Sequence, residues 1–77
     1  MDSRCQAVRA LLAAMGPRRA ESYIRAFDLQ DDEAQYIIER EARRRSIQEI
    51  ADDYNVSPET VKRRRKSGFS KIAEQSR

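Results

Sequence analysis

Five consecutive cations, residues 62–66, form the longest run of like charge in the chain. Lysine and arginine bind phosphate oxygens, and arginine also donates paired hydrogen bonds to the edge of guanine. The run therefore suggests a contact with nucleic acid. A merely solvated helix surface is the alternative interpretation, because charged runs are common on exposed helices. Residues 46–67, which precede and overlap the run, help to distinguish these two interpretations.

Two short helices joined by a tight turn are predicted there, in the order of a helix-turn-helix motif. The first is expected over about residues 46–54, because Ser46 and Glu49 have the spacing of a capping box. The second is expected over about residues 57–67, where Ser57 is a favoured N-cap residue. An ordinary helical hairpin is the alternative to this motif.

The turn between these helices has the residue types that the motif requires. Asn55 tolerates the left-handed backbone conformation expected at this point. Ala51 is small enough for the two helices to cross closely. The apolar side chains expected to face inward are Ile47, Ile50, Ala51, Tyr54, Val56 and Val61.

The second helix of such a motif lies in the major groove of double-stranded DNA. The residues predicted to contact bases are Pro58, Glu59, Lys62, Arg63 and Lys66. Glu59 can accept a hydrogen bond from cytosine, and Arg63 can donate to guanine. The residues predicted to contact the DNA backbone are Arg44, Arg45, Ser46, Ser57, Thr60 and Arg64.

The rest of the chain predicts an all-α fold, a small bundle of four to five helices. Apolar spacing and turn residues favour further helices over residues 3–15, 17–27 and about 31–44. Residues 69–76 either continue the last helix past a bend at Ser67-Gly68 or form a short separate helix. We expect one domain over residues 1–77. It would comprise an N-terminal helix pair (1–28), a scaffold or an interaction surface, and the helix-turn-helix unit (29–77).

Composition limits the chemistry that this chain can perform. Its 77 residues include no histidine and one cysteine, Cys5, which cannot supply the ligands of a zinc site. We therefore expect no metal, no cofactor and no enzymatic activity. The apolar stretches are too short to span a membrane. A cytoplasmic location is the consistent expectation.

The positive charge is concentrated in the second half of the chain. Residues 1–42 hold 6 Lys/Arg and 8 Asp/Glu, a net charge of −2, whereas residues 43–77 hold 10 and 5, a net charge of +5. This asymmetry is typical of a chain whose basic half faces phosphates.

Residues about 29–74 resemble region 4 of bacterial sigma factors and the related helix-turn-helix domains of response regulators. The residues that carry the resemblance are Ser46-Ile-Gln-Glu-Ile-Ala51 and Val56-Ser-Pro-Glu-Thr-Val-Lys62. The segment 62–73 looks most like small sigma-region-4-like regulators encoded by phages and mobile elements. The resemblance implies double-stranded DNA binding, transcription regulation and RNA polymerase as a further candidate partner.

Arg65 departs from the family pattern, which usually has a buried leucine there. Either its aliphatic stem covers the core while its charged head reaches solvent, or the helix rotates and ends early near Gly68. No part of the chain resembles the polymerase-clamping and promoter-melting region of a complete sigma factor.

Two other uses of the fold remain open. The chain can serve as a protein–protein adaptor that binds RNA polymerase or another regulator through its acidic first half. It can also form a homodimer, for which the first helix is the candidate surface. The apolar side chains of that helix are Val8, Leu11, Leu12 and Met15. The alternative is that they complete the core of the monomer.

Overall fold

The structure, a computed structural model, describes residues 3–76, and every regular element in that range is helical. The elements are α1 (Ser3–Ala13), α2 (Pro17–Arg25), α3 (Asp31–Ile37), the π-helix η1 (Ile38–Ala42), α4 (Ile47–Tyr54) and α5 (Pro58–Gln75). The prediction of an all-α fold is confirmed. None of these helices is both long and apolar enough to cross a membrane.

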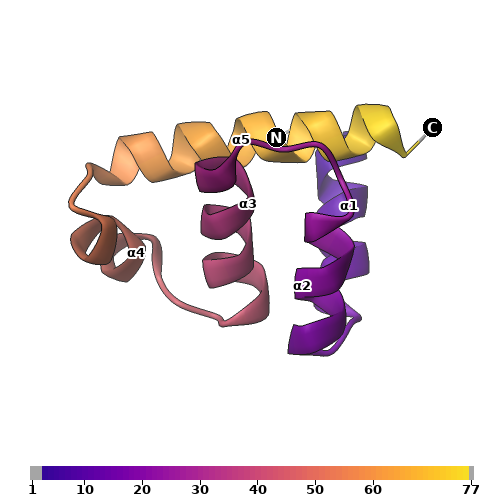
Figure 1. The fold of residues 1–77 in the computed structure, drawn as a ribbon, viewed down its shortest axis with the longest axis horizontal. Coiled ribbons are helices and arrows are strands. Elements are labelled where there is room, and N and C mark those ends of the chain that lie inside the picture. The colour runs from indigo at the N-terminus through magenta and orange to yellow at the C-terminus, as the bar shows by residue number, and fades with distance from the viewer. Residues whose placement is uncertain (1–2, 77) are drawn as a thin grey trace.

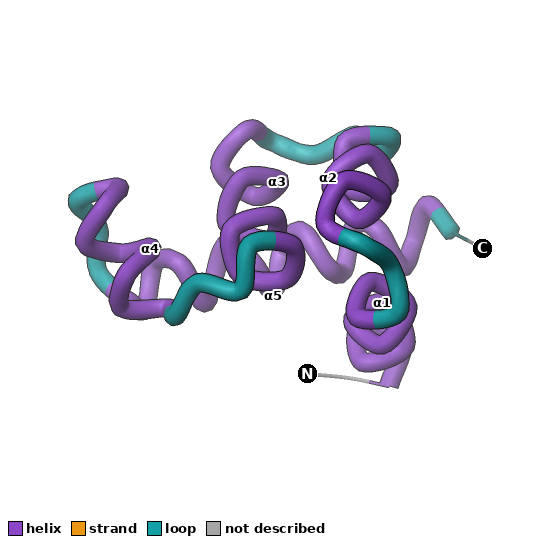
Figure 2. Tube along the Cα trace, turned by 90° about the horizontal axis from the view of Figure 1, so that it is seen from below, coloured by secondary structure: helices purple, strands orange, loops and turns teal. Residues whose placement is uncertain are grey.

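Helix α5 is the axis on which α1, α3 and α4 pack (Figure 1). Its 18 residues span about 27 Å at the ordinary helical rise. α4 lies at its N-terminal end, α3 crosses its middle, and α1 packs nearer its C-terminal end. α2 packs against η1 rather than against α5 (Figure 2). One helix thus holds both ends of the molecule together.

The interior has two separate clusters of buried apolar side chains. The larger one joins α1, α2, α3 and η1 to the C-terminal half of α5, and its members are Cys5, Val8, Leu12, Ala20, Ile24, Ala34, Ile37, Ile38, Ala42, Phe69, Ile72 and Ala73. The smaller one joins α4 to the N-terminal half of α5 and to the end of α3, and its members are Tyr36, Ile50, Ala51 and Val61. Most of the apolar burial that stabilises a fold therefore lies away from the helix-turn-helix end.

α5 continues without a break through Ser67 and Gly68, so the predicted weak point is not a bend. Gly68 is buried, and its nearest neighbours outside α5 are Ile37 and Glu33 of α3. A Cβ atom added there would lie 2.6 Å from Cδ1 of Ile37 and 3.3 Å from Cβ of Glu33. The glycine costs helix propensity but permits a close helix crossing, and the packing gained there offsets that cost.

The helix predicted over about residues 31–44 is present through Ala42, but it changes type in its second half. The α-helical pattern ends at Ile37, and a π-helical turn follows over Ile38–Ala42. The chain then leaves the helix at Arg44, whose φ is 59°. The wider turn keeps Ile38 and Ala42 in the larger cluster.

Two apolar side chains are more exposed than their spacing predicted. Leu11 is 46% exposed on α1, while its neighbours Val8 and Leu12 are buried. Tyr54 is 38% exposed at the end of α4, with its ring edge-on to Tyr36 at 5.2 Å between centroids. The first helix thus contributes Val8 and Leu12 to the core of the monomer. This burial corresponds to the alternative in which these side chains complete the monomer core.

Candidate nucleic-acid interface

The first helix of the motif begins with the predicted capping box. Oγ of Ser46 accepts a hydrogen bond from the Glu49 amide at 3.1 Å, and Oε1 of Glu49 accepts one from the Ser46 amide at 3.0 Å. The pKa of Glu49 is lowered, first by its hydrogen bond from the Ser46 backbone and then by the Ser46 hydroxyl. The start of α4 is fixed by residues that the sequence identifies.

The turn also forms as predicted. Asn55 adopts φ 56° and ψ 46°, the left-handed conformation that ends α4. The Val56 amide then donates to the Ala51 carbonyl at 3.0 Å, which closes the turn. Oγ of Ser57 accepts a hydrogen bond from the Thr60 amide at 3.1 Å, and Pro58 is the first residue of α5. Ala51 is fully buried at the crossing.

The charged residues predicted to contact bases lie on one exposed surface of α5. Glu59, Lys62, Arg63 and Lys66 are all exposed, and Pro58 is half-buried at the start of the helix. Within the described residues, none of the three cations forms an ion pair with a protein carboxylate. Their charge is available to an external partner.

This arrangement coincides with a known family. Residues 28–74 match the family described as Sigma-70, region 4. The chain belongs to this family. Sigma-70 region 4 is a helix-turn-helix DNA-binding region of sigma factors. No characterised protein and no solved structure matched the chain.

The matched segment of this sigma-70 region 4 protein begins just before α3, so α1 and α2 lie outside it. Those two helices nevertheless share the larger cluster with α3 and α5. The family match does not cover the N-terminal helices, although their buried side chains pack in the same cluster as those of α3 and α5.

Two of the arginines predicted to contact the DNA backbone are held by carboxylates of the protein itself. Arg64 donates to both carboxylate oxygens of Asp32, at 2.7 and 3.0 Å, and to the Gln30 side chain. Its hydrogen bond is the largest factor that lowers the pKa of Asp32. Arg45 pairs with Glu39 at 2.7 Å and with Asp53. A DNA phosphate would have to compete with these partners.

The other predicted backbone contacts are more open. Arg44, Ser46 and Ser57 are exposed, and Thr60 is half-buried. The Ser57 and Thr60 hydroxyls share a hydrogen bond of 2.9 Å, in which either can donate. The structure therefore leaves Arg44 and Ser46 as the most accessible members of this group.

Arg65 is buried, with 9% of its surface exposed, and α5 does not end near it. Its Nη2 donates to Oε1 of Glu41 at 2.6 Å, and its guanidinium lies 5.5 Å from the centre of the Phe69 ring. Burial lowers its pKa, and the Glu41 carboxylate opposes that shift. Of the two interpretations of this residue, the early helix end is wrong. The charged head is held inside the protein by Glu41 rather than extended into solvent.

A second buried charge joins α3 to the C-terminal half of α5. Glu33 is 1% exposed, and it accepts hydrogen bonds from Ser67 at 2.5 Å and from Lys71 at 2.9 Å. Burial raises the pKa of Glu33, but the Ser67 and Lys71 hydrogen bonds and that of the Gln30 amide together lower it below its ordinary value. Among residues 3–76, no group of three or more His, Cys, Asp or Glu side chains is arranged to hold a metal ion.

Proposed function

We propose that this chain is a small transcription regulator of bacterial or phage type that binds double-stranded DNA sequence-specifically. The N-terminal half of α5 would lie in the major groove, with Glu59, Lys62, Arg63 and Lys66 towards the bases and Pro58 at the groove wall. The observation that carries the proposal is that these charged side chains are exposed and form no ion pair with any residue in the range 3–76. Family membership supports the DNA-binding role.

The DNA backbone contacts in this proposal come from both helices of the motif. Arg44 and Ser46 would bind one phosphate at the start of α4, where free backbone amides also favour an anion. Ser57 and Thr60 would bind the strand beside α5. Arg45 and Arg64 would take part by exchanging a protein carboxylate for a phosphate. The Arg64–Asp32 pair is partly exposed, at 29% and 41% of the two side chains, a setting in which ion pairs contribute little stability. Glu39, the partner of Arg45, is 4% exposed, and it would keep its ion pair with Arg43 if Arg45 moved to a phosphate.

The remaining parts of the proposal concern the chain as a whole. Residues 1–77 would act as one domain, in which 1–28 serve as scaffold for the motif in 29–77. The chain would act in the cytoplasm by binding, without catalysis. The shared packing of α1 and α5 supports the scaffold role.

A selection of bound duplexes from a random pool tests this function. We expect an enriched sequence motif, and Arg63→Ala should lose preference at one base position at a cost of about 1–3 kcal/mol. Arg44→Ala should instead weaken binding to all sequences alike. A pool that stays random after repeated rounds would contradict sequence-specific binding.

RNA polymerase binding is a second candidate function, favoured by one observation. The start of α3 and the end of α4 form an open groove of about 420 Å³, lined by Asp31, Asp32, Gln35, Tyr36 and Tyr54. Its acidic rim and exposed tyrosine differ from the basic surface of α5. A pull-down of core polymerase that Tyr54→Ala abolishes and Lys62→Ala leaves intact would support this role.

A further inference from the structure

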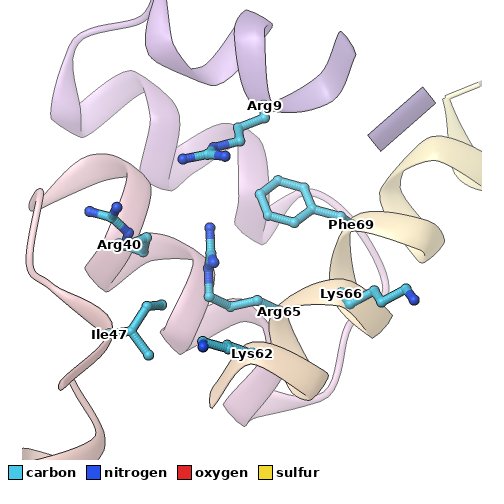
Figure 3. A pocket seen from close by; sticks show the side chains of 7 residues that line it. All are labelled: Arg9, Arg40, Ile47, Lys62, Arg65, Lys66 and Phe69. Carbon is cyan, nitrogen blue, oxygen red and sulfur yellow. The ribbon is translucent and has the colours of Figure 1, made fainter. Parts of the chain in front are cut away.

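A second basic feature lies beside the proposed DNA-binding surface, in a cavity between α1, η1, α4 and α5 (Figure 3). The cavity measures about 380 Å³, and five of the seven residues that line it are cationic. The lining consists of Arg9, Arg40, Ile47, Lys62, Arg65, Lys66 and Phe69. In Figure 3 the Arg65 guanidinium lies between Arg9 and Lys62, with Arg40 to one side, while the Lys66 ammonium points away.

The negative charge beside these cations is small. Within the described part of the chain, Glu41 is the carboxylate that pairs with them, at 3.2 Å from Arg9 and 2.6 Å from Arg65. Arg40 donates to the neutral backbone carbonyl of Arg45 at 3.3 Å. One carboxylate therefore faces several positive charges.

The buried arginine also has an unused donor. Nε of Arg65 is buried and, among residues 3–76, has no hydrogen-bond partner. Unsatisfied donors on buried charged groups are costly and rare. After burial and the opposing effect of Glu41, the charges of Arg9 and Arg40 further lower the pKa of Arg65. Like charges are thus close enough here to repel one another, and a bound anion would relieve that repulsion.

We propose that this cavity binds a phosphate group. Phosphate carries more charge than a carboxylate and offers several oxygens, which suit convergent guanidinium groups. Two sources share this chemistry: the backbone of a DNA duplex lying along α5, or a phosphorylated small molecule. The first source rests on the proposed DNA-binding function, whereas the second does not.

Arg9 gives the N-terminal helices a role beyond support. It lies on α1, outside the segment that matches the family, and it reaches the same cavity as Lys62 of the motif. The phosphate site is thus assembled jointly by the family motif and by the part of the chain that precedes it.

The first experiment titrates the full chain with sodium tripolyphosphate at low salt by isothermal calorimetry. The variant Arg9→Gln/Arg40→Gln is compared with Arg18→Gln/Arg19→Gln, which removes the same charge from exposed positions on α2. If a small molecule is the source, the wild type binds. In that case the cavity variant binds about tenfold more weakly, because charge-assisted hydrogen bonds are lost, and the control is unchanged.

The second experiment measures duplex binding by fluorescence anisotropy at several salt concentrations with the same three proteins. If the DNA backbone is the source, the affinity of the cavity variant depends less steeply on salt than that of the control. The slope of log affinity against log salt should be smaller in magnitude by about 2. A flat tripolyphosphate titration together with this slope change assigns the cavity to DNA. The proposal is overturned if the two variants have equal tripolyphosphate affinities and equal salt dependences of duplex binding.

Circular dichroism melting checks that each variant folds. If the cavity variant does not fold, amide chemical shifts of the wild type replace the comparison. Tripolyphosphate or duplex should shift Arg9, Arg40 and Ile47 more than Arg18 and Arg19, and uniform shifts overturn the proposal. If duplex fails to bind at all, the proposed function fails, while the tripolyphosphate titration still decides on the cavity.

Discussion

The two halves of α5 differ in how much of their side-chain surface is buried. In residues 67–75 the buried residues are Gly68, against α3, and Phe69, Ile72 and Ala73, which belong to the larger cluster. In residues 58–66 only Val61 and Arg65 are buried, and the remaining charged side chains are exposed or half-buried. The helix is anchored by its C-terminal half and presents its N-terminal half to a partner.

The halves also differ in how their cations are used. Lys71 pairs with the buried Glu33 of α3, so its charge serves the fold. Lys62, Arg63 and Lys66 have no such partner among the described residues, although they belong to the same helix. The location of a cation relative to the acidic start of α3, rather than the number of cations, decides which of them form ion pairs within the described part of the protein.

Gly68→Val tests the anchoring half and should have the largest effect on stability. The valine side chain would clash with Ile37 and Glu33 at the helix crossing, where even a Cβ lies too close. We expect a loss of about 2–3 kcal/mol in the free energy of unfolding, typical of overpacking. Urea denaturation followed by circular dichroism measures it.

Glu74→Val is the matched control for this substitution, because Glu74 is exposed on the same helix. It should change the free energy of unfolding by no more than about 0.5 kcal/mol. Equal effects of the two substitutions would show that the close crossing of α3 and α5 does not anchor the helix.

Glu33→Gln tests the charged part of the same anchor and should have a smaller effect. Glutamine can still accept hydrogen bonds but cannot attract Lys71, so we expect a loss of about 1–2 kcal/mol near neutral pH. Because the folded-state pKa of Glu33 is lowered from 4.5, its ionised form stabilises the fold above that pH. The contribution is lost as the pH falls through the lowered value.

The difference between wild type and Glu33→Gln should therefore shrink below about pH 4.5. Asp32, whose pKa Arg64 lowers, loses its contribution in the same acidic range in both proteins and so cancels in the comparison. A difference that stayed constant from neutral to acidic pH would indicate that the Glu33 charge does not stabilise the fold.

The parts of the structure set by local chemistry could be predicted from the sequence. The capping box at Ser46, the left-handed Asn55 and the cap at Ser57 each depend on residues within three or four positions. The exposure of the cations on α5 followed from the same helix register. These features define the helix-turn-helix end of the molecule.

The parts set by distant contacts could not be predicted. Gly68 was interpreted as a weak point, because its role depends on Ile37, 31 positions away. The cavity required Arg9 and Arg40 to meet Lys62, and no spacing in the sequence relates them. The ion pair that occupies Arg64 likewise depends on Asp32 of another helix. Local patterns identified the helix-turn-helix end, whereas tertiary packing determined which of its described charges form ion pairs.

Duplex binding by a variant lacking the free cations tests the division of α5 most directly. Anisotropy would compare Lys62→Ala/Arg63→Ala/Lys66→Ala with Arg4→Ala/Arg18→Ala/Arg19→Ala, which removes three exposed cations from α1 and α2. We expect the first variant to lose at least about 100-fold in affinity with an unchanged melting temperature, and the second to lose no more than about threefold. Equal losses in the two variants, or a wild type that does not bind duplex at low salt, would contradict the proposal that the N-terminal half of α5 reads DNA.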